Sequence, residues 1–427
     1  MTDVIDELRS WLDENWDPDL TVADWWDRLG LAGWASPSLP EHAYGRGLSR
    51  NDAVRVAEVI GEHGALPAPG GLGLLLAAPT IATHGTQAQI DHYVRDIVTG
   101  QAAWCQLFSE PVAGSDLAGL QTRAVQDGDE WIVDGQKVWT SGGHYADLGM
   151  LIARTNSDAP KHQGISYFAL DMHQPGVEIR PLREMTGRSL FNEVFMADAR
   201  TTTDAMIGDL NNGWAVANTT LAFERAGLGS GGGSAATSAA LPGTVAGHLD
   251  KRAGDFVHNR RSTQGGAQFR GADKMLIELA RQTGAIDDAT TRQDLMRLHT
   301  ISQIGRYNTL RLKALKARGG DIPGLGNISK LAMSEMMRLQ RDVGLRILGA
   351  AGTLHAYDPN DRAALDAATG NPTYGLVTEL ALFAQAPPIY GGTDQVQRNI
   401  IGERVLGLPK EPGPDRATPF KDLPKNG

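Results

Sequence analysis

The sequence predicts an α+β protein in which a helical segment, a β domain and a second helical segment follow one another along the chain. Three observations support this prediction. Apolar residues recur at helical spacing near the N-terminus, short β-branched and aromatic runs follow, and helical spacing then returns. With 427 residues, the chain exceeds the usual size of a single core and should form two or three packed units.

The first third of the chain has the pattern of a helical domain. Between residues 3 and 16, Ile5, Leu8, Trp11 and Leu12 lie at the spacing of one helix face. The same spacing recurs, to about residue 100, in stretches that are separated by Pro and Gly residues. We therefore predict an N-terminal helical domain over residues 1–104.

The next segment, residues 105–210, has the pattern of a β domain. Its apolar runs are short, rich in β-branched or aromatic residues, and separated by turn residues: WIV, LGMLIART, ISYFALDM and NEVFMAD. Asp-Gly pairs at 127 and 134 flank the first run at hairpin spacing.

Helical spacing returns after residue 213 and predicts a C-terminal helical bundle over residues 211–408. A Gly, Ser and Ala stretch (227–247) and a basic segment (251–266) interrupt it and indicate a surface excursion, whose role the sequence does not define. Residues 409–427, rich in Pro and Lys, predict a mobile tail.

Composition excludes several classes of function. The formal charge of -10, with both signs mixed along the chain, argues against nucleic-acid or anionic-membrane binding. A single cysteine, Cys105, excludes an internal disulfide and fits a reducing compartment. The N-terminus is acidic rather than basic and then apolar, and the apolar run 72–82 is too short to span a bilayer. We therefore expect a cytoplasmic protein.

Four blocks carry a family resemblance: QLFSEPVAGSDL (106–117), GDEWIVDGQKVWTSGG (128–143), LGAAGTLHA (348–356) and GGTDQVQRNIIGERVLGLP (391–409). In this order and spacing the chain resembles the flavin-dependent acyl-CoA dehydrogenases. The resemblance implies FAD as cofactor, no metal, and conversion of an acyl-CoA to its 2,3-enoyl-CoA in lipid metabolism such as fatty acid β-oxidation. It also implies an electron-transferring flavoprotein as acceptor and a homo-oligomer, dimer or tetramer, with a hetero-oligomer as a further possibility.

The first block would contact the flavin. A Gly and Ser rich turn after an apolar strand offers backbone and hydroxyl donors to a polar ligand. By resemblance, Phe108 and Ser109 would meet the isoalloxazine ring, and Ser115 the flavin or the CoA arm. Val112 replaces a glycine common in the family, which puts the local backbone path in question because valine adopts positive φ at a cost. An ordinary β-turn is the alternative.

The second block resembles the family's tryptophan and hydroxyl pair. Trp139 would cover one face of the flavin. Ser141, two residues on along a strand, would project to the same side and donate a hydrogen bond toward flavin N5. A plain strand tryptophan is the alternative.

The last two blocks would serve the pyrophosphate of the cofactor. Gly349 and Gly352 would allow close backbone approach, and Thr393 and Gln395 would open a helix whose N-terminal amides favour anions. In the family such contacts often come from a neighbouring subunit, which implies an oligomer. Packing of helices through small residues is the alternative account of the glycines.

Two further sequence features do not lead to a definite assignment. The arginine that would hold the adenine end of FAD has three candidates, Arg260, Arg261 and Arg270. Gly227, Gly229 and Gly232 match the GlyXaaGlyXaaXaaGly motif of dinucleotide-binding proteins. That motif should follow a strand, and here it follows a helical pattern, so we reject the dinucleotide-binding interpretation.

The catalytic base is the main question. Dehydrogenation needs a base for the α proton while the thioester carbonyl is polarised. By resemblance the usual glutamate is replaced by Gly391, whose backbone amide would still donate to the thioester carbonyl. A minority of members carry the base immediately before an arginine, and here that residue is Glu224, beside Arg225. A solvated surface pair is the alternative. Arg225 would support the base or the CoA arm, and Gly392 would lie at the substrate.

Two other functions remain open. The loss of the carboxylate at residue 391 favours a non-catalytic or half-catalytic partner subunit in a hetero-oligomer, a role known in branches that degrade bulky acyl chains such as steroid side chains. Flavin monooxygenases and oxidases share the architecture and lack an acyl-CoA base. The length and branching of the acyl chain cannot be read from the sequence.

Overall fold

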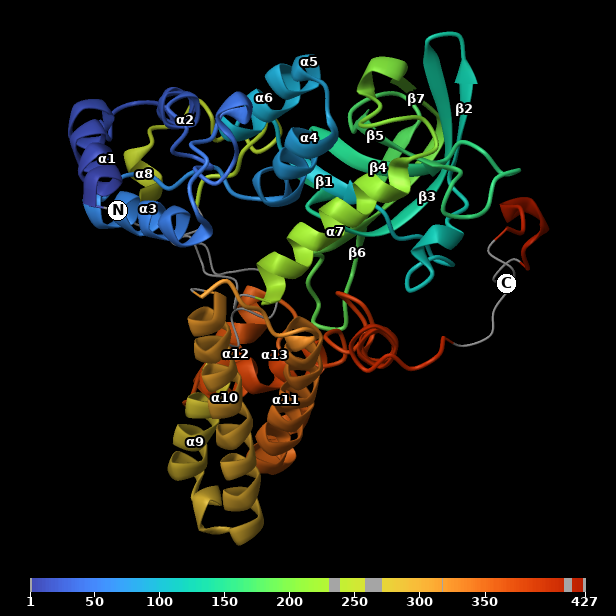
Figure 1. Ribbon diagram of the computed structural model, residues 1–427. Helices are drawn as coiled ribbons and strands as arrows, with labels where there is room; N and C mark the ends of the chain where they lie inside the picture. Colours follow the sequence, from blue (N-terminus) through green and yellow to red (C-terminus); the bar gives the residue numbers. More distant parts are fainter. Residues whose placement is uncertain (1, 230–238, 258–270, 317, 411–416, 425–427) are drawn as a thin grey trace. The chain divides into compact units, whose positions relative to one another are not determined.

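The computed structural model describes residues 2–229, 239–257, 271–316, 318–410 and 417–424. Within them, the predicted order of helical, β and helical segments is confirmed (Figure 1). The chain forms two compact units. The first comprises Met1–Leu182, Leu190–Ser262 and Gly413–Gly427, and the second comprises Arg183–Ser189 and Thr263–Pro412.

The helices of the first unit begin where the sequence provides caps. The hydroxyls of Thr21 and Ser49 accept the backbone N–H groups of Asp24 and Asp52 and open the second and third helices. A π-helical turn, Gly73–Ala77, leads directly into the fourth helix. The helices of the N-terminal part are α1 (Thr2–Asn15), α2 (Val22–Leu31), α3 (Arg50–His63), α4 (Ala78–His84), α5 (Gln87–Gln89) and α6 (Arg95–Val98). Two more, α7 (Gly213–Gly229) and α8 (Gly254–Val257), follow the sheet.

The described part of the first unit contains one sheet of seven strands: β1 (Trp104–Leu107), β2 (Arg123–Asp127), β3 (Glu130–Ser141), β4 (Leu148–Arg154), β5 (Ile165–Asp171), β6 (Val177–Leu182) and β7 (Phe191–Thr202). Their order is β1-β4-β2-β3-β7-β6, and β5 pairs with β4. Strands β1 and β4 run parallel, whereas β2 and β3 form a hairpin.

Only the first of the two Asp-Gly pairs makes a hairpin turn. Gly128 adopts φ +65° between β2 and β3, a conformation that glycine reaches without strain. Asp134 and Gly135 lie inside β3, where the pairing with β7 shifts register between Val133 and Gly135. The second pair therefore marks a bulge rather than a turn.

The two faces of β1 point into different cores. Trp104 and Phe108 pack with the N-terminal helices and with α7, which lies across β4 and β5 (Figure 1). Cys105 and Leu107 pack into the other face of the sheet. Complete burial raises the pKa of the Cys105 thiol to about 12, so the side chain is a neutral structural thiol.

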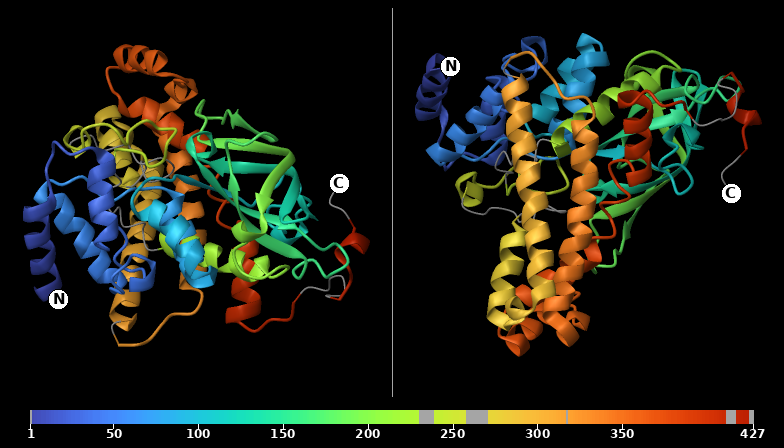
Figure 2. Two further views of the ribbon diagram at one scale, coloured as in Figure 1. Left: turned by 90° about the horizontal axis from the view of Figure 1, so that it is seen from above. Right: turned by 60° about the horizontal axis from the view of Figure 1, so that its bottom comes forward.

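The second unit is a helical bundle: α9 (Ala272–Thr283), α10 (Ala289–Lys316), α11 (Leu325–Leu348), α12 (Pro359–Thr369), α13 (Thr373–Phe383) and α14 (Asp394–Ile400). The long helices α10 and α11 run alongside each other (Figure 2). Leu276, Leu298, Val343 and Val377 meet in its core. Apolar side chains on one face of α9, α11 and α13 are thus buried in this core.

The prediction of a mobile tail is wrong for its described end, residues 417–424. The backbone N–H of Phe420 donates to the carbonyl of Ala159 over 2.9 Å, and that of Lys421 donates to Ser157 over 3.0 Å. The guanidinium carbon of Arg154 lies 3.7 Å from the centre of the Phe420 ring. Backbone pairing and a buried cation therefore attach this segment to the first unit.

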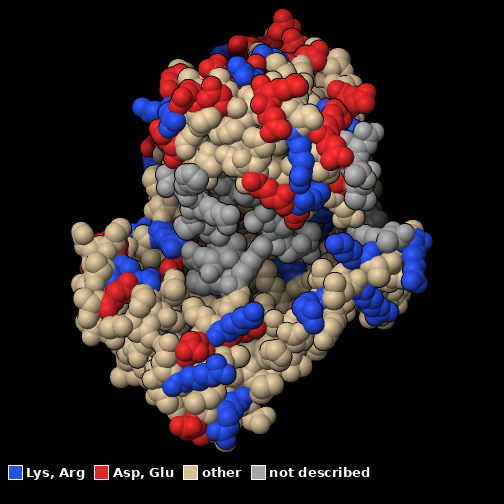
Figure 3. Space-filling model, turned by 90° about the vertical axis from the view of Figure 1, so that its left-hand side faces the viewer, with Lys and Arg blue, Asp and Glu red and all other residues tan. Residues whose placement is uncertain are grey.

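The surfaces of the N-terminal and the C-terminal helices differ in charge. Figure 3 shows acidic side chains gathered over the N-terminal helices, whereas Lys and Arg are more frequent on the visible face of the C-terminal helices. The N-terminal helices thus lack, on this face, the continuous basic surface that nucleic-acid binding needs. In the part of the chain that the structure describes, no helix combines the length and apolar character of a membrane span.

Candidate functional site

Alternate residues of β1 and of the position that follows it place three side chains on one face of the strand. Trp104 and Phe108 belong to the core between the sheet, α7 and the N-terminal helices. Gln106, between them, donates a hydrogen bond from Nε2 to Oε2 of Glu224 over 3.4 Å. The predicted base therefore lies over the strand that leads to the predicted flavin contact Phe108.

The environment of Glu224 is not that of a solvated surface pair. The side chain is half-buried on α7, whereas its neighbour Arg225 is exposed. Burial raises the pKa of the Glu224 carboxyl, against the lowering effects of the Gln106 hydrogen bond and the Arg225 charge. A carboxylate with a raised pKa is better matched to proton abstraction near neutral pH than an ordinary one.

The backbone at Trp139 is strained. This residue adopts φ +62°, rare for a bulky side chain, at a register shift between Lys137 and Thr140. Its indole is 60 % exposed and meets Phe191 edge to face, with ring centres 5.9 Å apart. The regular alternation expected for Trp139 and Ser141 is therefore interrupted by a bulge, and the strain leaves a broad indole surface open to a ligand.

The hydroxyls singled out in the sequence are free to bind. Among the described residues, none makes a hydrogen bond with the side chain of Ser109, Ser115 or Ser141. The backbone N–H of Val138 donates to the carbonyl of Ser109 over 2.9 Å, which joins the first two sequence blocks. An exposed indole beside unpaired hydroxyls fits a planar heteroaromatic ring with a polar edge, so these residues fit a flavin.

Val112 does not disturb the turn. Its side chain is exposed, and it is not among the non-glycine residues with positive φ. The conformation of this loop therefore does not require glycine at residue 112.

A buried ion pair that the sequence does not reveal holds this loop. Lys137, fully buried on β3, donates from Nζ to the carbonyl of Phe108 over 3.0 Å and to Oε1 of Glu110 over 2.9 Å. The Glu110 carboxylate also accepts the backbone N–H groups of Gln121 and Thr122. Burial raises the pKa of Glu110, but the Lys137 charge and these hydrogen bonds outweigh it and hold that pKa below its usual range. Lys137 thus ties the start of the Ser115 loop to β3, and Glu110 ties the start of the loop to its end.

In the second unit, the turn before α14 presents a free backbone donor. Gly391 and Gly392 adopt φ +62° and +78°, and Nε2 of Gln397 donates to the carbonyl of Gly391 over 2.9 Å. No described residue accepts the N–H of Gly391. Gln397, 4 % exposed, shapes this turn, whereas the predicted contact Gln395 is exposed to solvent.

The start of α14 carries a carboxylate of its own. Thr393 caps the helix by accepting the N–H of Val396 over 3.1 Å. Asp394, 2 % exposed, forms ion pairs with Lys330 and Arg338. The start of this helix therefore carries a carboxylate that is paired with two cations. It differs from the simple anion-binding helix N-terminus that the sequence predicts.

The glycines after α11 have structural explanations. Gly349 ends the helix at φ +55°, ψ −128°, a conformation that favours glycine. A Cβ atom at Gly352 would lie 3.2 Å from the Leu345 side chain. Helix termination accounts for Gly349 and close contact with Leu345 accounts for Gly352, and their predicted role at the pyrophosphate stays a prediction.

Several predicted features lie wholly or partly outside the described residues. They include Arg260, Arg261 and Arg270 and much of the excursion 227–270. Gly227 and Gly229 end α7, in agreement with rejecting the dinucleotide motif. Among the residues with defined positions, no group of three His, Cys, Asp or Glu side chains could hold a metal ion.

Comparisons with known proteins match the whole order of segments. Models of the acyl-CoA dehydrogenase N-terminal, middle and C-terminal domains match residues 3–101, 105–198 and 254–406. The acyl-CoA dehydrogenase IpdE1 of Mycobacterium tuberculosis is 35 % identical over 387 residues, covering 91 % of this chain and 88 % of the relative.

Two solved structures are also similar to the chain. The steroid ACAD Tcur3481-Tcur3483 superimposes with a TM-score of 0.68 at 25 % identity, over 96 % of this chain and 98 % of that chain. The ChsE4-ChsE5 complex of Mycobacterium tuberculosis gives a TM-score of 0.66 at 26 % identity, over 96 % and 98 % of the two chains.

Proposed function

The chain belongs to the acyl-CoA dehydrogenase family, and from this premise we propose that it is an FAD-dependent enzyme that converts an acyl-CoA thioester into its 2,3-enoyl-CoA. The observation that carries the proposal is the half-buried Glu224 carboxylate, hydrogen-bonded to Gln106 on the strand that ends at Phe108. Burial at that position raises the pKa of the carboxyl, which suits a base that works near neutral pH.

The proposed roles follow from these positions. Glu224 takes the α proton on a carboxylate oxygen, and Gln106 holds that oxygen in place. FAD, when bound, supplies the acceptor for the hydride that leaves the β carbon. Trp139 offers the face for the ring, while Ser109, Ser115 and Ser141 offer hydroxyl donors. In the second unit, the N–H of Gly391 makes no hydrogen bond with a described residue and is free to donate to a carbonyl oxygen.

The acyl group is proposed to be bulky. The structural neighbours include a protein described as a steroid ACAD and a two-protein complex, ChsE4-ChsE5. We propose steroid-derived acyl-CoA thioesters as the first class to test, with an electron-transferring flavoprotein as electron acceptor and an oligomeric assembly. Conversion of these substrates would place the enzyme in lipid breakdown.

A panel of acyl-CoA thioesters tests this function. The purified protein is mixed anaerobically with short, long, branched and steroid thioesters while the visible flavin band is followed. We expect bleaching by one class, which would establish dehydrogenation and identify the substrate together. Bound flavin that no thioester bleaches would contradict the proposal, and turnover that requires oxygen would indicate a monooxygenase or oxidase instead.

A partner subunit of a hetero-oligomer is the second candidate. It is favoured by glycine at residue 391, where the resemblance predicts a carboxylate, and by the complexes among the structural neighbours. Co-purification of a second, related chain, with flavin reduction only in its presence, would support this function. Reduction by the isolated chain would overturn it.

The pH dependence of flavin reduction should report the environment of Glu224. A base must be deprotonated, and burial raises this pKa, so we expect the rate to fall with decreasing pH at values above the usual 4.3 or so of glutamate. Gln106→Leu removes a hydrogen bond that lowers the pKa of Glu224, so the acid limb should move to higher pH.

A matched control exists for this pH experiment in the same sheet. Gln136 donates to Glu193 over 2.9 Å, so Gln136→Leu breaks an equivalent pair away from Glu224. This control should leave the profile unchanged. An acid limb that is identical in wild type and Gln106→Leu would contradict the proposed contact.

A further inference from the structure

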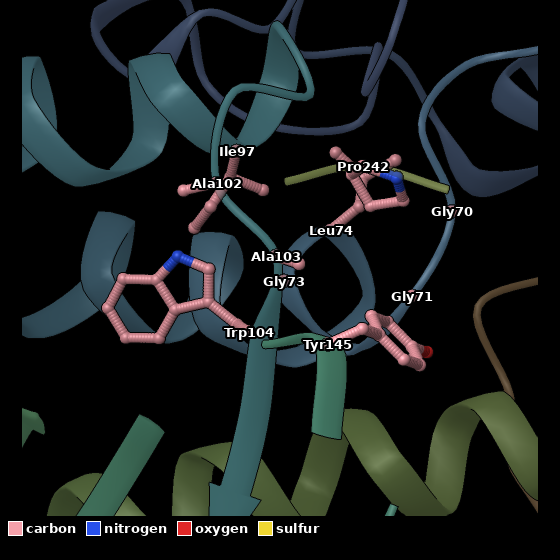
Figure 4. A pocket seen from close by; sticks show the side chains of 10 residues that line it. All are labelled: Gly70, Gly71, Gly73, Leu74, Ile97, Ala102, Ala103, Trp104, Tyr145 and Pro242. Atoms are coloured by element: carbon pink, nitrogen blue, oxygen red, sulfur yellow. The ribbon is translucent and has the colours of Figure 1, made fainter. Parts of the chain in front are cut away.

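A small cavity lies beside the indole of Trp104 in the first unit. Its volume is about 10 Å³, roughly the room of one water-sized group. Figure 4 shows Leu74 and Ile97 with Trp104 around it. Gly73 leaves one wall open, since a Cβ atom there would lie 3.3 Å from Cδ1 of Trp104. The wall beside the nitrogen-bearing edge of the indole is therefore glycine backbone rather than side chain.

The indole nitrogen of Trp104 is a buried donor without an acceptor. The side chain is 4 % exposed and stacks edge to face on Tyr93, with ring centres 5.5 Å apart. Nε1 has no hydrogen-bond partner among the described residues. An indole N–H can only donate, and buried polar groups in native proteins are nearly always paired. The cavity is thus suited to an acceptor atom.

The cavity lies beside Trp104, two residues before the glutamine of β1 that contacts the predicted base. Trp104 and Gln106 are two residues apart on one face of the strand, about 7 Å from each other. Gln106 holds Glu224, which would take the α proton of the substrate. The unpaired indole N–H of Trp104 thus lies on the strand face that also carries the side chain holding the predicted base.

We propose that Trp104 is a specificity-determining residue whose indole N–H binds an oxygen on the acyl tail, so that the preferred substrates are acyl-CoA thioesters with a hydroxyl or carbonyl group beyond the reacting carbons. This inference rests on the proposed function. A methyl group in the same place would leave the buried N–H unpaired, and a site built to bind an oxygen discriminates against the analogue that lacks it.

Binding of unreactive analogues tests the proposal. Thioesters with sulfur in place of the β carbon cannot give up a hydride, so they report binding alone. A series of tail lengths is made, each with a terminal methyl and a terminal hydroxyl. Affinity is measured by calorimetry on the FAD-loaded protein. We expect the hydroxyl analogue of one length to bind about 10-fold or more tightly than its methyl partner.

Substitutions then identify the donor. Trp104→Phe should abolish the preference for the hydroxyl analogue and leave binding of the methyl analogue nearly unchanged. A benzothienyl side chain at residue 104 keeps the indole shape without the N–H and gives the same expectation if the phenylalanine variant folds poorly. Trp131→Phe is the matched control, because Trp131 is also 4 % exposed in the sheet but donates to Thr203.

The outcomes separate this inference from the proposed function. Equal binding of both analogues at every length, or equal weakening of both by Trp104→Phe, would overturn the role of Trp104 while bleaching by any thioester still upheld dehydrogenation. Failure of every reactive thioester to bleach the flavin would overturn the function itself, whatever the analogues show.

Discussion

Glu224→Gln should lower the rate of flavin reduction by acyl-CoA by roughly 10²- to 10⁴-fold, the usual contribution of a positioned general base. Glutamine keeps the size of the side chain but cannot take the α proton. It can still accept a hydrogen bond from Gln106, so the fold around β1 should be retained. FAD should therefore stay bound while chemistry stops.

Anaerobic stopped-flow absorbance measures this loss directly, with the flavin content read from the same spectrum. Glu193→Gln is the matched control, because Glu193 is also half-buried and accepts from a glutamine of the sheet. It should reduce flavin at the wild-type rate. Substrate reduction at an undiminished rate by Glu224→Gln would exclude Glu224 as the base and strengthen the partner-subunit alternative.

The fold could be predicted because period and turn residues are local signals. Helical spacing in the first and last parts and short apolar runs between them identified the segments correctly. The alternation of β1 also follows from its sequence once the strand is recognised, since Trp104 and Phe108 face one core and Cys105 the other.

The contacts that shape the site could not be predicted, since they join residues far apart in the sequence. Gln106 meets Glu224 from another element, and Lys137 meets Glu110 across a loop. Nothing in the local pattern around either pair specifies its partner. Tertiary packing alone decides which polar side chains are buried together.

Local patterns also failed where the backbone departs from regular geometry. The alternation assumed for Trp139 and Ser141 does not survive the bulge in β3. In α14, Gln395 and Gln397 are both compatible with a helix. Only Gln397 lies on the buried face, and it makes the contact with the Gly391 turn. Such choices depend on the surroundings of a helix, which the sequence of the helix does not contain.

Lys137→Met should destabilise the protein by about 3–5 kcal/mol, the cost of removing one partner from a buried ion pair. The change leaves the Glu110 carboxylate buried without its counterion and the carbonyl of Phe108 without its donor. Because the pair fixes the loop that carries Ser109 and Ser115, we expect weaker FAD binding as well.

Urea unfolding and fluorescence titration of FAD measure the two effects of Lys137→Met. Lys161→Met is the matched control, because Lys161 pairs with Asp116 of the same loop while both side chains are partly exposed. Such a pair contributes about 0–1 kcal/mol, so the control should change little. Equal effects of the two variants would show that burial of the Lys137 pair has no special importance.

Acid provides an independent test of the same ion pair. The folded-state pKa of Glu110 lies below its usual value, so its contribution to stability is present above the unfolded pKa of about 4.3 and is lost as the pH falls toward the folded pKa. Wild-type stability should therefore decline across this acid range. In Lys137→Met the counterion is gone and the burial penalty remains, so the pKa of Glu110 should rise above the unfolded value. Protonation of Glu110 should then relieve part of the damage, and the stability gap between the two proteins should narrow as the pH is lowered.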